Sequence, residues 1–254
     1  MQPRRSTFSA LKSAARTSQK QRPRRRDQFI SVALFILLIL VAVQCARLGV
    51  AGLFVQLGQD EMDSWTSASR APGKAAIRRA TNYFTRSIAY TADNPWSLEG
   101  LGALYLTRMR AATNPREALA LTRDARVRFL HALRQRPTSP FLWANLALTK
   151  LYLDEVDDEL LAALRYADEL GPWEATVQQT ILFVGLAVWQ HLDAAQRQAI
   201  VRTIERGATR NPHKMFEIVN SYTRFDLVCA IEEYKRIAGP VCRNATETAK
   251  PRNR

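Results

Sequence analysis

The chain has 254 residues, of which 47% are apolar and 24% charged, and this composition is typical of a folded protein and excludes a disordered one. The length allows one membrane anchor and one domain of ordinary size. A net charge of +14 suggests nucleic acid as a partner, but nine of the 37 Lys and Arg residues lie within residues 1–27. The remaining chain has a basic surplus of only six, so we expect no nucleic-acid partner.

Residues 1–27 predict a basic tail, and residues 28–47 predict a transmembrane helix. The centre of this helix, 29–46, contains two clearly polar side chains, Ser31 and Gln44. Eighteen helical residues are about 27 Å long, close to the thickness of the hydrocarbon core of a bilayer. A cleaved signal usually has a shorter apolar region, and the sequence QCA at the end of this one is a poor cleavage site. We therefore expect an uncleaved anchor.

The charges on either side of the span indicate its orientation. Nine basic residues precede it, whereas Asp60, Glu61 and Asp63 follow it. The positive-inside rule predicts a protein of the bacterial inner membrane, with its N-terminus in the cytoplasm and its C-terminal domain in the periplasm. One alternative remains open, because residues 1–26 are rich in Arg and Ser and contain no acid, as a mitochondrial presequence does.

Beyond the span, the pattern predicts helices and no convincing strand. Residues 48–73 are interpreted as a stalk and linker that ends in the helix-breaking sequence RAPG. Residues 74–240 alternate helical patterns with short turns marked by proline, and residues 241–254 form a polar tail. The expected fold is all-α.

Two stretches of the predicted domain are similar at matching offsets. ATNYFTRSIAYTADNPWSLEGLGALY begins at Ala80, and ARVRFLHALRQRPTSPFLWANLALTK begins 45 residues later at Ala125. Lys150 stands in the second copy where the first has an aromatic residue, and two later copies, near Pro172 and Pro212, are fainter. The positions expected to pack between helices are Ala80, Phe84, Leu101, Gly102, Tyr105, Ala125, Phe129, Ala132, Trp143, Leu146 and Ala147.

This pattern of small and bulky residues resembles the tetratricopeptide repeat (TPR), a helical hairpin of about 34 residues. The resemblance implies a solenoid of stacked hairpins that binds a protein partner through the wall formed by the first helix of each hairpin. It places Trp96, Glu99, Phe141 and Tyr152 on that wall as candidate groove residues. Alternatively, Trp96 and Phe141 pack between hairpins.

Few residues suggest chemistry. Cys229 and Cys242 are thirteen residues apart and form either a disulfide or two free thiols. The three histidines lie far apart, and no phosphate-binding loop or zinc motif is present, so we expect no enzyme, cofactor or metal. The acidic run DEVDDE, 154–159, is interpreted as a solvated turn at a helix start and, alternatively, as a cation site.

A basic tail, one span and an external repeat domain, together with TADNPWSLEGLGALYLTRM, resemble the VpsP type of exopolysaccharide biosynthesis protein. The resemblance implies a membrane-anchored scaffold or adaptor that binds proteins of an envelope or polysaccharide assembly. Two alternatives are a mitochondrial inner-membrane assembly factor and a glycan-binding module that uses its tryptophans.

Overall fold

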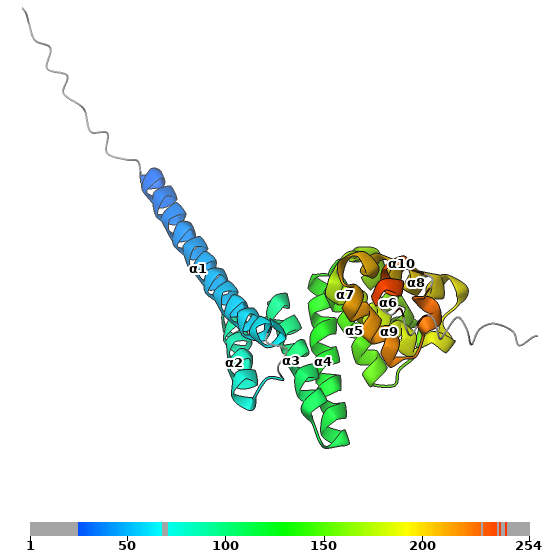
Figure 1. Ribbon diagram of the computed structural model, residues 1–254. Helices are drawn as coiled ribbons and strands as arrows, with labels where there is room; N and C mark the ends of the chain where they lie inside the picture. Colours follow the sequence, from blue (N-terminus) through cyan, green and yellow to red (C-terminus); the bar gives the residue numbers. More distant parts are fainter. Residues whose placement is uncertain (1–24, 68–70, 230, 238, 240–241, 243–254) are drawn as a thin grey trace, which may run out of the picture. The chain divides into compact units, whose positions relative to one another are not determined.

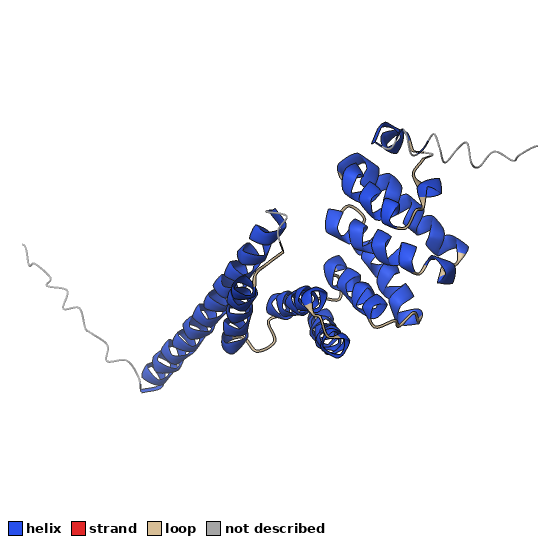
Figure 2. Ribbon diagram, turned by 60° about the horizontal axis from the view of Figure 1, so that its bottom comes forward, coloured by secondary structure: helices blue, strands red, loops and turns tan. Residues whose placement is uncertain are grey.

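The structure is a computed structural model that describes residues 25–67, 71–229, 231–237, 239 and 242 (Figure 1). The polar tail expected at 241–254 and most of the basic tail expected at 1–27 lie outside the described residues. The described residues contain helices and no strand, so the all-α prediction is confirmed (Figure 2). The helices are α1 (Arg25–Ser67), α2 (Lys74–Tyr90), α3 (Pro95–Ala111), α4 (Pro115–Gln135), α5 (Pro140–Tyr152), α6 (Asp158–Leu170), α7 (Ala175–Ala187), η1 (Trp189–His191), α8 (Ala194–Arg210), α9 (Pro212–Ser221), η2 (Phe225–Leu227) and α10 (Glu232–Ile237).

The chain divides into two units, residues 1–46 and 47–254. Unit 1 contains the first part of α1. Its large apolar side chains between Phe29 and Val43 are 47–76% exposed. So continuous an apolar surface marks a segment that needs an apolar environment. The N-terminal helix is therefore long and apolar enough to cross a membrane, as the sequence predicts.

Unit 2 begins with residues 47–67, the last part of α1. Helix α2 follows in the chain and packs antiparallel against this part. Glu61 forms an ion pair with Arg79 near the start of α2 at 2.8 Å, and the ring of Phe54 stacks on Tyr90 at its end, with centroids 6.0 Å apart. Between these contacts Val55 is buried in a small core with Phe84. Residues 48–67 of the segment interpreted as a stalk are thus the last part of α1, and this part packs against α2 as the first helix of a hairpin.

The following helices are also paired, and small residues let the pairs approach closely. α3 packs most extensively on α4, and α5 on α6. A Cβ atom on Gly102 of α3 would lie 2.5 Å from the ring of Phe129 on α4, so only glycine fits against that ring. Gly185 of α7 faces Ile200 of α8 in the same way, at 2.4 Å. Large side chains of one helix therefore fill the spaces left by glycine on its partner.

The residues at the helix starts explain where the helices begin. Pro95, Pro115 and Pro140 occupy first-turn positions, where the missing N–H of proline has no cost. The residues whose side chains accept hydrogen bonds from backbone N–H groups of the first turn are Asn94, Asn114, Ser139, Asp157 and Asp193. Each such cap contributes about 1 kcal/mol, which fixes the short turns between neighbouring helices.

The main core runs through α3 to α10 and ends at the C-terminal helix. Tyr234 of α10 is fully buried, and its hydroxyl donates a hydrogen bond to the carbonyl of Ile204 on α8 at 3.1 Å. In the same region the structure joins Cys229 and Cys242 in a disulfide. The last described helix is therefore attached to the domain by burial, by a hydrogen bond and by a covalent link.

Candidate binding crevice between α6 and α8

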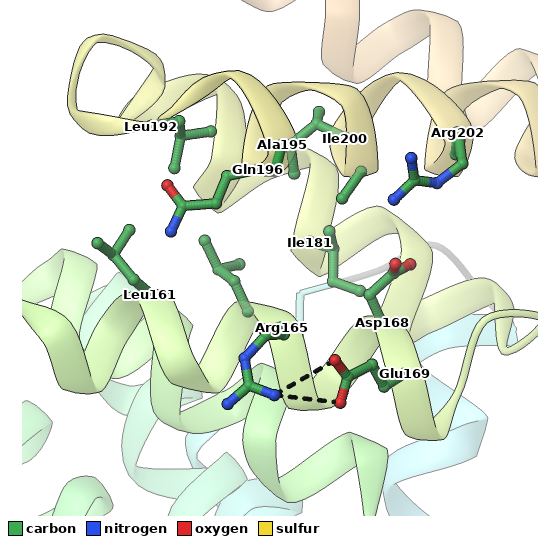
Figure 3. A pocket seen from close by; sticks show the side chains of 12 residues that line it. Leu161, Arg165, Asp168, Glu169, Ile181, Leu192, Ala195, Gln196, Ile200 and Arg202 are labelled. Atoms are coloured by element: carbon green, nitrogen blue, oxygen red, sulfur yellow. Dashed lines mark hydrogen bonds and ion pairs between the residues drawn. The ribbon is translucent and has the colours of Figure 1, made fainter.

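An apolar crevice lies between α6 and α8, and α7 forms its floor (Figure 3). Leu161 and Leu164 of α6 form one wall, Ile200 of α8 belongs to the other, and Ile181 of α7 lies between them. The crevice opens because α6 and α8 both pack on α7 and make few contacts with each other. Ala195 and Ala199 on α8 also line it, and their small side chains leave the space unfilled.

A polar bridge closes the crevice at one end. Asp168 of α6 accepts hydrogen bonds from the hydroxyl of Thr203, at 3.1 Å, and from the guanidinium of Arg206, both on α8. Side chains of Asp168 and Arg206 are 16% and 19% exposed. A charged pair so little exposed fixes the two helices at that end, so the remaining opening has a defined width.

The rim of the crevice carries charged and amide groups. Arg165 and Glu169 pair along the surface of α6 at 3.3 Å. Gln196 of α8 accepts a hydrogen bond from the backbone N–H of Asp193 at 2.9 Å, and this contact orients its amide. Arg202 is exposed and makes no ion pair among the residues that the structure describes. The rim therefore offers a cation and an amide beside an apolar floor.

The volume of the crevice limits what it holds. At about 260 Å³ it is slightly smaller than the roughly 300–1,000 Å³ of most small-molecule sites. An apolar side chain from another polypeptide fits this space better than a large cofactor does. Within the described ranges, no group of three or more His, Cys, Asp or Glu residues is placed to hold a metal ion.

The candidate groove residues lie in two places outside this crevice. Trp96 and Glu99 of α3 form a cluster with Arg136 of α4, whose guanidinium lies 3.3 Å from the centre of the Trp96 ring and 2.7 Å from the Glu99 carboxylate. Burial raises the pKa of Glu99 above its usual value, although Arg136 acts in the opposite direction. The ion pair with Arg136 occupies the carboxylate of Glu99.

The other two candidates are on α5. Phe141 and Tyr152 share a face of this helix, but eleven residues place them about 16 Å apart, at its two ends. Phe141 is 36% exposed, whereas Tyr152 is half-buried and lines a hollow with Phe183 and Ile218. In the alternative interpretation, Trp96 and Phe141 pack between hairpins and would be buried. Their side chains are exposed, Trp96 at 48%, so this alternative does not fit. The structure does not bring the four residues together at one site.

The expected packing positions all lie in or against the core. Tyr105 and Trp143 are half-buried and pack against it. The others are buried, and they are Ala80, Phe84, Leu101, Gly102, Ala125, Phe129, Ala132, Leu146 and Ala147. These residues have a structural role, and the TPR interpretation of their pattern stays a prediction.

The acidic run 154–159 surrounds a lysine of the protein itself. The side chain of Lys150 is 1% exposed, and its amine lies 3.1, 2.8 and 2.7 Å from carboxylates of Glu155, Asp157 and Glu159. Arg126 of α4 also binds Glu159, at 2.7 Å. Burial opposes the charge on Lys150, but the hydrogen bonds outweigh it and raise the pKa of the amine. This cluster attaches the turn before α6 to α5 and α4.

Comparisons with known proteins give no further guide. No protein-family model, no curated protein and no solved structure matches the chain. The crevice was not found by sequence reasoning, because its alanines have the ordinary pattern of a helix surface.

Proposed function

We propose that the protein is a single-pass membrane scaffold whose helical domain binds a protein partner in the crevice between α6 and α8. The observation that carries this proposal is the combination of an exposed, membrane-length apolar helix with a packed helical domain that has an open apolar crevice. An apolar side chain of the partner enters between Leu161 and Ile200. Arg202 and Gln196 at the rim offer hydrogen bonds to groups next to that side chain.

We place the domain in the periplasm of a bacterium. Two observations support this location, the nine basic residues before the span and the disulfide between Cys229 and Cys242. Disulfides form and persist in oxidising compartments and are rare in the cytosol. Alkaline phosphatase fused after Arg254 should be active in a bacterial host, whereas a reporter that works only in the cytoplasm should be inactive. Activity of the cytoplasmic reporter alone would reverse the orientation.

The role of the crevice is tested with a matched pair of variants. Ala195→Phe fills the crevice, whereas Ala194→Phe adds the same ring one residue earlier, at an exposed position that does not line it. Chemical crosslinking in membranes of the native host identifies proteins bound to the full-length chain. A specific partner should be lost from Ala195→Phe and retained by Ala194→Phe. If both variants crosslink to the partner equally, the partner does not bind in the crevice.

For the process that the scaffold serves, we propose exopolysaccharide biosynthesis or export. This step is supported by the layout of the chain and the sequence TADNPWSLEGLGALYLTRM, through their resemblance to the VpsP type. Deletion of the gene should lower the amount of cell-surface polysaccharide. Wild-type protein and Ala194→Phe should restore it, and Ala195→Phe should not. Unchanged polysaccharide in the deletion strain would contradict the assignment.

A glycan-binding module is a second candidate, favoured by two exposed tryptophans. Trp96 is 48% exposed and Trp173 is 53% exposed. Each ring, however, already has a guanidinium over one face, Arg136 at 3.3 Å and Arg210 at 5.7 Å. Only the opposite face remains for stacking against a sugar. Titration of tryptophan fluorescence with candidate oligosaccharides distinguishes the two functions, since a scaffold should show no change at millimolar sugar.

A further inference from the structure

The basic charge of the helical domain is concentrated in its first helices. Residues 71–123 contain eight basic and three acidic residues, whereas residues 124–239 contain 14 basic and 15 acidic ones. Of the three acids in the first segment, Glu99 is already paired with Arg136 at 2.7 Å. A positive electrostatic potential therefore remains on α2, α3 and the start of α4.

Three of these basic side chains line one open hollow, which we call the basic hollow. Lys74 and Arg78 are one helical turn apart at the start of α2, and Arg108 is in the last turn of α3. The hollow has a volume of about 600 Å³. Glu117, at the start of α4, is the one acid among the described residues that line it, so the lining has a net charge of +2.

The three cations of the basic hollow are exposed, and none of them forms an ion pair with an acid in the part of the chain that the structure describes. By contrast, the neighbouring Arg79 is bound to Glu61 at 2.8 Å. Arg108 lies 5.9 Å from the centre of the Tyr105 ring, a contact that does not neutralise its charge. The crevice between α6 and α8 has one exposed cation of this kind, Arg202, whereas the basic hollow brings three together.

The remaining lining residues indicate which kind of anion fits. Ile77, Ala111 and Ala112 are apolar, and no aromatic ring is among the described residues of the lining, so a sugar has no flat surface on which to stack. An apolar side chain can instead contact Ile77 while carboxylates on either side of it reach the arginines. A guanidinium group binds a carboxylate through two parallel N–H donors. These features match an acidic polypeptide segment that also contains apolar residues.

We propose that the basic hollow docks an acidic segment of a protein partner. Carboxylates of that segment bind Arg78 and Arg108, and Lys74 contributes a third positive charge. Opposite charges on the two surfaces also steer the partner towards this face of the domain. The hollow shares no residue with the crevice between α6 and α8, so its test is independent of the proposed function.

Photochemical crosslinking of the full-length protein in a nonionic detergent tests the proposal. The probe is a short peptide of glutamate and leucine that carries a photoreactive diazirine, and mass spectrometry locates the crosslinked residues. Their location is needed because the basic residues of 1–27 also attract the peptide. Arg78→Gln combined with Arg108→Gln removes two cations of the hollow. Arg123→Gln combined with Arg134→Gln is the matched control, since it removes the same charge from exposed positions of α4 that do not line the hollow.

We expect crosslinks between residues 74 and 117 in the wild-type protein. Their yield should fall about tenfold in the hollow variant, because two exposed ion pairs are lost, and stay unchanged in the control. Both variants should keep the helical circular dichroism of the wild type, since the replaced side chains are exposed. Absence of crosslinks in this range, or equal yields from both variants, overturns the proposal.

A competition experiment distinguishes a polypeptide from an acidic glycan. Polygalacturonate, a polymer of acidic sugars, and the unlabelled peptide are compared as competitors at equal concentrations of carboxylate. The peptide should prevent crosslinking in the hollow more effectively, because its leucines contact Ile77 and the sugars have no ring to stack on. More effective competition by polygalacturonate would assign the hollow to an acidic glycan and overturn the docking of a polypeptide.

Discussion

Replacing Lys150 by methionine tests whether one buried amine holds the turn before α6. Methionine keeps the length and the apolar stem of the side chain, and it removes the charge. Three carboxylates then lose a hydrogen-bond donor at 2.7–3.1 Å. Arg126 remains as a partner of Glu155 and Glu159. The loss therefore concerns the amine alone.

The expected cost is the balance of two effects. Breaking a fully buried ion pair costs about 3–5 kcal/mol, because an uncompensated charge stays in the interior. Here the carboxylate side chains of Glu155, Asp157 and Glu159 are 37%, 51% and 39% exposed, so water solvates them once the amine is gone. Hydrogen bonds to charged groups contribute about 1.5–3 kcal/mol, and solvent screening lowers their total. We expect Lys150→Met to lower the free energy of unfolding by about 2 kcal/mol.

Urea unfolding of the full-length protein in mild detergent, followed by helical circular dichroism, measures this change. Lys214→Met is the control, since Lys214 pairs with Glu217 at 2.6 Å on an exposed surface where both side chains are more than half exposed. The control should cost less than about 0.5 kcal/mol. If Lys150→Met costs no more than the control, the cluster does not stabilise the turn and the reasoning is refuted.

The pH dependence provides an independent test of the same cluster. Hydrogen bonds raise the pKa of Lys150 above its usual 10.5, so its contribution is complete below that pH and is lost as pH rises through the higher folded value. Hydrogen bonds from Lys150 lower the pKa of Glu159 and Asp157 from their usual 4.5 and 3.8. Their contribution is present above those values and is lost as pH falls through the lower folded ones. The difference between wild type and Lys150→Met should be constant from about pH 5 to 10 and decrease on both sides.

Two further changes test the packing and the covalent link. Gly102→Leu should destabilise the protein by about 2–3 kcal/mol, because its side chain meets the Phe129 ring. Gly52→Leu is the control and should cost little in the same unfolding assay, since Gly52 is an exposed helical position where a Cβ has no atom within 4 Å. Cys229→Ser should lower the midpoint of thermal unfolding. The disulfide closes a 13-residue loop to Cys242, and opening it removes about 3 kcal/mol of constraint on the unfolded chain. A midpoint that neither the substitution nor a reductant changes would contradict the disulfide.

The all-α class and several of the buried positions could be predicted from the sequence because these features repeat along the chain. Ala80 and Ala125 stand four residues before Phe84 and Phe129, and all four residues are buried in the structure. Spacing of this kind is a direct consequence of helical periodicity, so it can be seen in one chain. Proline and capping residues then mark the turns. The exposed apolar helix near the N-terminus could be predicted for a different reason, because its length and hydropathy alone indicate it.

The crevice could not be predicted in this way. Ala195 and Ala199 on α8 have the same pattern whether a neighbouring side chain fills the space above them or leaves it open. Whether that space stays open depends on the distance between α6 and α8. This distance in turn depends on how both helices pack on Ile181 of α7. A cavity is a property of three helices together, so no periodicity within one of them indicates it.

The role of Lys150 shows how a departure from a pattern can itself carry information. In the repeat alignment Lys150 takes the place of an aromatic residue, which reads as a failure of the second copy. A lysine at a core position requires anions close by, because an isolated buried charge is very costly. The nearest acids in sequence are those of 154–159, and they follow within one short turn. The two anomalies, a lysine inside and a run of acids at the next turn, explain each other, and the structure joins them through Glu155, Asp157 and Glu159.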